Sequence, residues 1–526
     1  MLGALSVFAF LCAQDPNVPA SQPKQELKLS PLEAVPIPDD EQHTEGVERL
    51  RLADCVRMGM LQNTTLTEFG LVPRIRAEDV RAARAFFEPE LFGAVGAARS
   101  QSPGRSAVQP ASTATTYDAQ VGLRQRVVTG GLFQLEFSPV RVQQTVNSTL
   151  AFPTRYYTAE WTASFTQPLL RGAWIDYNTA NIERSKTEES SAENDFEADR
   201  QGVLLSIVQA YWNLVFTRAD YRVRRQSLDL AREQLRITDE RIRAKVLAER
   251  DRIADEADVA RREGELILAA NSIRNAEDAL RRLVLPFRTG TGDWQVHIIP
   301  VSGFEADDLP PNPTWELAAE VAVLRRPDLV RLRNDEKVAG IELMQARRDL
   351  LPRLDLTGAY SSDGFANNHL DDAIDQAARL DFPDWSTRLD LVVPIGNSAA
   401  RAREVRARLS VEKAERARRN KELDIVRETR SAVWEIDTLV KRIAAGKETV
   451  RLAESNLDTE LSRLRVGRST AFEVQRRNQD LAEARSSLIR SQLDLRIAWM
   501  ALLKAQGTLF LTAFGDEPGT ASRPGS

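Results

Sequence analysis

The sequence of 526 residues contains few of the side chains from which most catalytic and metal-binding sites are built. Its three histidines, His43, His297 and His369, are far apart in the chain. A histidine-based metal site or a Ser-His-Asp triad therefore has few candidate residues. The sequence has no GxxxxGKS or GxxxxGKT motif, and Gly290 and Gly292 lack the third glycine of a dinucleotide-binding loop. These absences exclude a phosphate-binding enzyme.

The chain also lacks an excess of either charge and any long apolar segment. Lys and Arg together number 71 and Asp and Glu 76, which gives a net charge of −5. No basic surface for nucleic acid is therefore indicated. The longest apolar stretch, about residues 2–13, is far shorter than the roughly 20 residues of a transmembrane helix. We expect no helix of this chain to span a bilayer, although strands could do so.

Cysteine is almost absent, and the two that occur, Cys12 and Cys55, predict no structural disulfide. Residues 1–13 are typical of a signal peptide, although they lack a basic first region, which indicates a truncated or misassigned start. Cys12 could alternatively carry a lipid, but Leu11 stands where a small residue is usual. Residues 14–45 are rich in proline and predict an extended linker.

The sequence repeats itself at an offset of about 222 residues. Tyr211-Trp212 aligns with Val433-Trp434, Arg241 with Arg463, and Ala279-Leu280 with Ala501-Leu502. We interpret Trp212 and Trp434 as residues that pack between helices. A weaker match aligns Pro89 with Pro352. We therefore predict the following domains: a first repeat over 46–285, a connector over 286–313, a second repeat over 314–510 and a flexible tail over 511–526.

Each half shows the same order of patterns: a helix, then strands, then a long helical hairpin. Alternation of apolar and polar residues, clearest over 157–165, predicts half-buried strands. The strand regions are about 90–167 and 353–394, and the helical hairpins about 176–284 and 397–507. The first half predicts strands at 90–99 and 156–167 and leaves open an extra hairpin, 118–127 with 131–138.

The long helical runs carry a heptad pattern, as in Leu228, Leu235 and Ile242, which indicates coiled-coil packing. Seventy helical residues extend about 100 Å, more than a compact domain. Four strands from one chain are too few for a membrane barrel, which needs at least about eight. Self-association into a ring would close the sheet, and three copies would give twelve strands and twelve helices.

Segments 166–172 and 208–214, with the duplicated helix-strand-strand-helix plan, resemble the TolC family of outer-membrane efflux and secretion channels. The resemblance covers about 46–510. It implies an α+β membrane protein and a homotrimer, in which a β-barrel in the outer-membrane lipid continues into a long α-helical coiled-coil barrel through the periplasm. It also implies a periplasmic adaptor and an inner-membrane pump or ABC exporter as partners, with no cofactor and no catalysis.

The resemblance also places a gate at the hairpin tips. Gly467 matches the family's turn glycine, and Glu473, six positions on, becomes a candidate for a ring of carboxylates that favours cations. The family often has a second acid one helical turn later, where this chain has Arg476. In the first half, Lys245 replaces the turn glycine, and Asp251 aligns with Glu473. A solvated carboxylate on a polar helix is the alternative interpretation.

Two further sets of candidate residues follow. Leu247 and Ala471, at the tips, are candidate contacts for the adaptor, although they could simply pack within the turns. Tyr156, Tyr157 and Trp161 suit an aromatic belt at a bilayer interface, or packing within a half-buried sheet.

Two rival functions remain at this point. A soluble or periplasmic coiled-coil scaffold is permitted by the heptads but needs neither the strands nor the signal-like start. A surface-layer or adhesion protein would use the long segment 101–153, rich in Ser, Thr, Gln and Val. The favoured hypothesis is a passive outer-membrane channel, and the sequence does not specify its substrate.

Overall fold

The computed structural model describes residues 47–103, 112–146, 154–285, 294, 297–301 and 312–509. The predicted signal peptide, Cys12, the linker over 14–45 and the tail over 511–526 lie outside these residues, as does most of the connector. The described chain belongs to one compact unit, residues 46–526. Among the described residues, no helix is both long enough and apolar enough to cross a membrane.

The strands form one six-stranded antiparallel sheet in the order β2-β3-β4-β5-β7-β8. The strands are β2 (Glu90–Ser102), β3 (Ser112–Arg126), β4 (Leu132–Val146), β5 (Arg155–Pro168), β7 (Arg353–Ala366) and β8 (Pro383–Val392). The extra hairpin, which the sequence left open, is therefore present as β3 and β4, and the expectation of four strands per chain is wrong. The pairing extends from Arg126 opposite Leu132 to Ser112 opposite Val146.

The sheet has one apolar and one polar side. Register pairs such as Leu123 with Leu135 and Tyr360 with Trp385 place apolar side chains of all six strands on one side. We call this side the apolar face. Its exposed members are Leu91, Val95, Tyr117, Val121, Leu123, Phe133, Leu135, Phe165, Leu356, Tyr360, Trp385, Leu389 and Leu391. The opposite side carries polar residues such as Glu136, Glu160 and Arg388.

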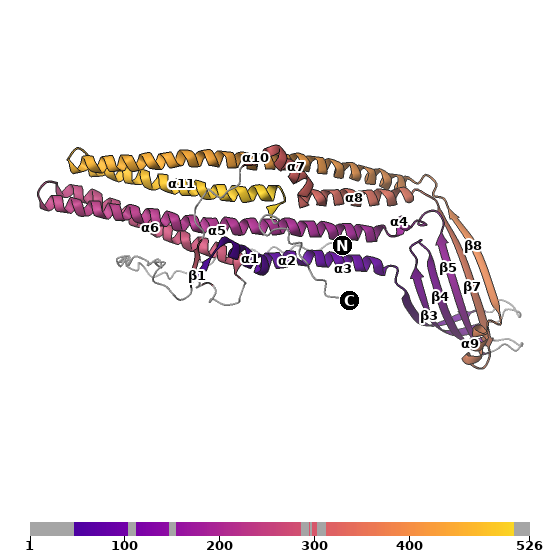
Figure 1. Ribbon diagram of the computed structural model, residues 1–526. Helices are drawn as coiled ribbons and strands as arrows, with labels where there is room; N and C mark the ends of the chain where they lie inside the picture. Colours follow the sequence, from indigo (N-terminus) through magenta and orange to yellow (C-terminus); the bar gives the residue numbers. More distant parts are fainter. Residues whose placement is uncertain are drawn as a thin grey trace, which may run out of the picture. The chain divides into compact units, whose positions relative to one another are not determined.

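Two long helical hairpins extend from the sheet (Figure 1). The first consists of α5 (Ala180–Arg243) and α6 (Glu249–Val284), and the second of α10 (Ser398–Arg465) and α11 (Ala471–Ala505). Helix α5 also packs against α11, so the helices lie side by side in the order α6, α5, α11, α10. With 64 residues, α5 is about 100 Å long.

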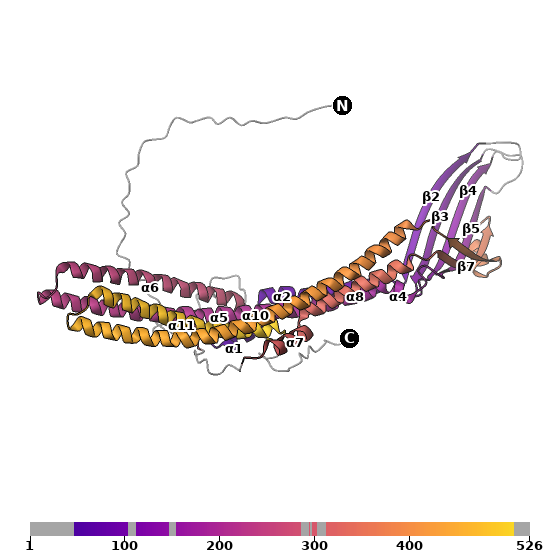
Figure 2. The ribbon, with the colours of Figure 1, turned by 90° about the horizontal axis from the view of Figure 1, so that it is seen from above.

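Shorter helices precede the sheet in each half. They are α1 (Leu52–Gln62), α2 (Thr64–Phe69) and α3 (Leu71–Ala85) in the first half and α7 (Trp315–Arg325) and α8 (Pro327–Arg348) in the second. The sequence predicts helix at 46–63 and 77–87 in the first half and at 314–350 in the second. In the structure the Asn63 side chain caps α2, and Pro327 begins α8 and so divides the helix predicted in the second half. Figure 2 shows α8 running along α10.

Two short elements complete the unit. Residues 47–50, predicted as helix, form strand β1 (Val47–Leu50), which pairs in parallel with β6 (His297–Pro300). This small sheet covers the main helical core, whose centre includes Tyr211, Leu214 and Leu280, each fully buried. A short helix, α9 (Leu370–Ala378), connects β7 to β8, and α4 (Ile175–Asn178) precedes α5.

Candidate functional site at the hairpin tips

The two hairpin tips have the same backbone conformation. Lys245 has φ 64° and Gly467 φ 73°, both in the left-handed region. The N–H of Lys245 donates to the Ile242 carbonyl at 2.8 Å, and the N–H of Gly467 donates to the Leu464 carbonyl at 3.1 Å. This arrangement satisfies the free carbonyls of a helix end. Lysine thus occupies the glycine conformation in the first half, at a cost of about 1 kcal/mol.

Glu473 lies in the first turn of α11, where its N–H donates to Thr470 Oγ1 at 3.4 Å. Its carboxylate lies 3.9 Å from the guanidinium of Arg477, and the Glu473 side chain is 40% exposed. Arg477 pairs more closely with Asp480, at 3.2 Å. The cation beside Glu473 is therefore Arg477 and not Arg476, and such an exposed pair is weak. The carboxylate remains available to the space in front of the tip.

The other predicted tip residues are placed as follows. Asp251 lies in the first turn of α6, and its side chain is outside the part of the chain that the structure describes. Leu247 lies in the turn between α5 and α6 and is half-buried. Ala471 is the first residue of α11. The most exposed large apolar side chains near the tips are instead Val246, Val466 and Phe472, at 70%, 68% and 67%. Sequence reasoning missed them, although large apolar residues in a polar turn were a visible signal.

A buried polar network lies behind the first tip. The carboxylate of Asp255 on α6 is 1% exposed and accepts hydrogen bonds from Thr238 Oγ1 and Gln475 Nε2, each at 2.6 Å. It therefore joins α5, α6 and α11. A buried carboxylate is stable only when such partners surround it. No sequence pattern indicates this network, because it depends on which helices become neighbours.

The two tips are also joined directly. Both terminal nitrogens of the Arg241 guanidinium, on α5, donate to the Leu464 carbonyl at 3.4 Å, at the end of α10. A cation at a helix C-terminus is stabilised by the helix dipole. Further along, the Arg262 guanidinium pairs with Asp258 at 2.8 Å and contacts Ser227 within the first hairpin, and it donates to the Gln475 carbonyl of α11 at 3.3 Å. The first hairpin is thus fixed to the second by side chains that sequence reasoning did not identify.

An ion cluster holds the junction of α7 and α8 against α10. Asp328 lies 2.6 Å from Arg326 and 2.9 Å from Lys421, and Arg326 also pairs with Glu428. Partial burial alone would raise the pKa of Asp328, but hydrogen bonds from Arg326 and Lys421 outweigh it and lower this pKa. The cluster favours the ionised carboxylate.

The predicted belt aromatics lie on both sides of the sheet. Tyr157 and Trp161 are on the apolar face, where α9 partly covers them, and the Trp161 ring stacks on Phe137 at 4.4 Å. Tyr156 is on the polar side, its ring 5.6 Å from that of Phe365. The exposed Tyr and Trp side chains of the apolar face are Tyr117, Tyr360 and Trp385, at 47%, 44% and 78% exposure, and the sequence analysis did not name them.

Comparison with known proteins shows which solved structures share this fold and which family the second half of the chain matches. The crystal structure of the CmeC outer membrane channel of Campylobacter jejuni superposes with a TM-score of 0.64 at 15% identity, covering 87% of this chain and 86% of that one. The fold is therefore that of outer-membrane channel subunits. Residues 318–508 match the family described as outer membrane efflux protein. The second half of this chain is therefore similar to the outer membrane efflux proteins.

Two curated relatives are similar over most of their length. Outer membrane efflux protein BepC of Brucella suis is 23% identical over 347 residues, which cover 64% of this chain and 70% of BepC. Alkaline protease secretion protein AprF of Pseudomonas aeruginosa is 23% identical over 353 residues, which cover 66% and 69%. One relative is thus named for efflux and the other for secretion.

Proposed function

We propose that this protein is the outer-membrane channel of an efflux pump or a type I secretion system. Three copies form a passive conduit across the outer membrane and the periplasm, and the hairpin tips gate it. A periplasmic adaptor binds at the tips, and an inner-membrane pump or ABC exporter supplies the energy. The proposed channel involves no catalysis and no cofactor.

The observation that carries the proposal is the exposed apolar face of the six-stranded sheet. Large apolar side chains from every strand are open to solvent on this face, among them Val95 at 87% and Trp385 at 78%. An exposed patch of this kind marks a membrane or protein contact. The opposite, polar side suits a water-filled interior. A soluble scaffold would have no use for such a sheet.

The internal repeat supports a ring of copies, because it indicates what covers each open helix face. In the first half, Trp212 on α5 is 3% exposed, and the Arg496 guanidinium of α11 lies 5.0 Å from its ring centroid. The equivalent Trp434 on α10 is 54% exposed. The residue equivalent to Arg496 is Arg274 on α6, which is exposed. A second copy that places α6 against α10 would stack Arg274 on Trp434; we call this contact the α10–α6 seam.

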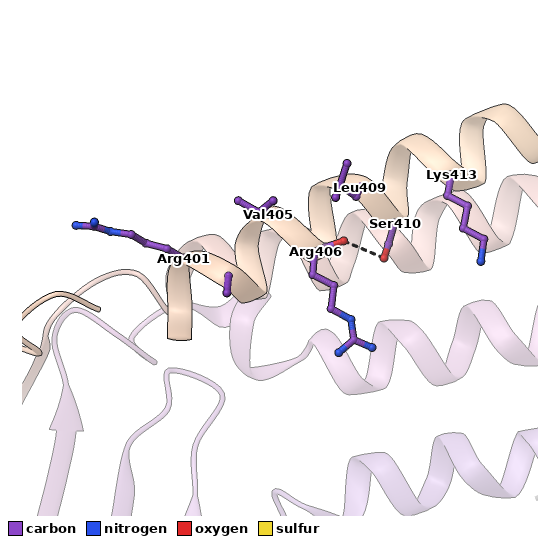
Figure 3. A pocket seen from close by; sticks show the side chains of 7 residues that line it. Arg401, Val405, Arg406, Leu409, Ser410 and Lys413 are labelled. Carbon is purple, nitrogen blue, oxygen red and sulfur yellow. Dashed lines mark hydrogen bonds between the residues drawn. The ribbon is translucent and has the colours of Figure 1, made fainter. Parts of the chain in front are cut away.

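A second contact follows from the same reasoning nearer the sheet. Helix α5 packs between α3 and α8, whereas α10 packs against α8 and leaves an open groove over Val405 and Leu409 (Figure 3). Leu409 is 56% exposed, but its equivalent Thr187 on α5 is 3% exposed. Helix α3 of a second copy would fill the groove with exposed residues such as Ile75, which is 59% exposed.

Charge agrees with this second contact. Within one copy, the Arg184 guanidinium on α5 lies 4.0 Å from the Glu342 carboxylate on α8. The equivalents are Arg406 on α10, which lines the groove, and Asp79 on α3. Opposite charges are therefore retained at the position where the next copy would bind. The same ring would join the unpaired edges of β2 and β8, and three copies would close three times six strands, enough for an aqueous channel.

Thiol cross-linking across the α10–α6 seam tests the proposal. Within one copy, Arg485 donates to Gln226 Oε1 at 2.9 Å, and the equivalents of this pair are Glu263 and Glu448. A Glu263→Cys/Glu448→Cys variant, treated with a short bifunctional thiol reagent in mild detergent, should give covalent dimers and trimers. The matched control, Gln226→Cys/Arg485→Cys, should be cross-linked only within single chains.

The two native cysteines should not interfere with this experiment, because Cys12 lies in the predicted signal peptide and Cys55 is buried. Cys55 is fully buried, and burial raises its pKa to about 12, so the thiol stays protonated near pH 8. Glu263→Cys and Glu448→Cys, each made alone, report any remaining background reaction. The particle can be trimeric while the control variant is cross-linked and the test variant gives no covalent dimers or trimers. In that case the assignment of the α10–α6 seam is wrong. A particle that is itself monomeric would contradict the proposed channel.

A further inference from the structure

Helix α9 lies on the apolar face at the end of the sheet away from the long helices (Figure 1). Its Ala373 and Ala377 are fully buried against Ala159 and Ala366 of the sheet, with Trp161 beside them. These sheet residues share the apolar face with exposed Leu389 and its neighbours. The helix therefore sits on the same side of the sheet that, in the proposed function, faces lipid.

The contact between α9 and the sheet is built from small residues. Gly364 lies directly under α9, and a Cβ at this position would overlap the Ala373 carbonyl oxygen. Gln376 Oε1 accepts a hydrogen bond from the Phe365 N–H at 3.1 Å. Close packing and a side-chain bond to the strand fix the helix on this face. The position of α9 is thus specified by the sequence of both partners.

The two sides of α9 differ in chemistry. Asp371, Asp372 and Asp375 point away from the sheet and are exposed. The chain that follows α9 exposes large apolar side chains, with Phe382 at 61% and Trp385 at 78%. A helix with carboxylates on its outer side cannot lie among acyl chains, because charged groups are costly in hydrocarbon. Aromatic residues, in contrast, are favoured at the boundary between acyl chains and headgroups.

We propose that α9 lies outside the channel wall, at the level of the lipid headgroups of the outer leaflet. In this position the buried alanines remain on the sheet, the carboxylates are solvated among headgroups, and Phe382 and Trp385 enter the boundary region. The apolar face below α9, towards the long helices, is then the part in contact with acyl chains. This inference rests on the proposed function, since it requires the apolar face to lie in a membrane.

Depth-dependent fluorescence quenching tests the position of α9. Asp372→Cys, on the outer side of the helix, is labelled with an environment-sensitive fluorophore, and the protein is reconstituted into phospholipid vesicles. The vesicles contain lipids with a spin label either at the headgroup or deep in the acyl chain. We expect stronger quenching by the headgroup label than by the deep label, together with quenching by iodide added to the water.

Two neighbouring residues on opposite sides of β8 provide matched controls. A fluorophore at Leu389→Cys, on the apolar face, should be quenched by the deep spin label and protected from iodide. At Arg388→Cys, on the polar side, iodide alone should quench. If Leu389→Cys is not quenched by lipid, the membrane proposal itself fails. If it is quenched, but Asp372→Cys responds to iodide alone or to the deep label most strongly, the assignment of α9 is overturned.

A displacement variant gives a second, independent readout. Gly364→Val should lift α9 from the sheet, because the added side chain occupies the space of the Ala373 carbonyl. The label at Asp372→Cys should then lose most of its headgroup quenching, while the signal of Leu389→Cys in the same background stays unchanged and shows that the sheet is still inserted. Unchanged quenching at Asp372→Cys would contradict the role of this contact.

Discussion

Replacing Trp434 with alanine separates the stability of one copy from the stability of the assembly. Trp434 is 54% exposed in a single copy, whereas the equivalent Trp212 is 3% exposed. If the α10–α6 seam buries Trp434 to the same extent, about half of a surface of ~250 Å² is removed from water. At ~25 cal/mol per Å² this contributes about 3 kcal/mol to each seam.

Trp434→Ala should therefore leave the unfolding of the separated chain nearly unchanged and promote dissociation of the oligomer by about a hundredfold per seam. The assay is the particle mass in mild detergent over a dilution series, beside thermal unfolding of the dissociated chain. Trp212→Ala should do the reverse and destabilise the single chain by about 3–5 kcal/mol.

Leu452→Ala is the control for exposed apolar residues on α10. Leu452 is 47% exposed. Its equivalent on α5, Leu230, is 40% exposed even though α11 packs against α5 within the same copy. The seam should therefore not cover Leu452, and the variant should dissociate like the parent. If Trp434→Ala dissociates no more readily than Leu452→Ala, the reasoning from the internal repeat is refuted.

Three further predictions concern the tips, the buried network around Asp255 and the ion cluster at the junction of α7 and α8. Glu473→Gln combined with Asp251→Asn should reduce the cation preference and raise the conductance of the channel in a planar bilayer; unchanged values would remove both residues from the gate. Asp255→Ala should lower the stability of the hairpins by about 1–3 kcal/mol, because buried donors lose their acceptor; chemical denaturation measures this, and a neutral result would show that the network is not structural. Because the folded pKa of Asp328 is lowered, its contribution is present above the unfolded pKa of about 3.9 and is lost as pH falls through the folded pKa. Asp328→Asn should thus lower the melting temperature at pH 7 but not at about pH 2, and an equal loss at both pH values would refute the charge-based explanation.

The sequence predicted the helical part well because its patterns are long and repeated. The offset of 222 residues aligns Lys245 with Gly467, and the structure gives both the same left-handed conformation and the same hydrogen bonds. A single lysine in place of glycine made this equivalence uncertain from sequence. The surrounding helices determine the conformation of the turn. The free-energy cost of the left-handed conformation at Lys245 is small.

The sheet was harder to predict, because its chemistry is less regular. Strands β3 and β4 extend into a segment rich in Ser, Thr and Gln, which resembles a loop in composition and was assigned in one rival interpretation to adhesion. The alternation that identified β5 placed Tyr157 and Trp161 on one face correctly. It could not show that the connection between β7 and β8 contains a short acidic helix, α9, which covers part of that face.

The side chains behind the tips could not be predicted for a different reason. Asp255 and Arg241 are ordinary charged residues in helices that contain many of them. Their roles depend on the neighbours that the fold provides: Gln475 for Asp255, and the Leu464 carbonyl for Arg241. Periodicity identifies which helices exist, but the order in which they pack comes from the structure.

The mass of the protein extracted from the outer-membrane fraction in mild detergent, corrected for bound detergent by light scattering, tests the central claim most directly. A ring of copies embedded in the outer membrane predicts a stable particle of three chain masses that requires detergent for solubility. A single chain or a dimer that stays soluble without detergent would contradict the channel, the seam and the gate together.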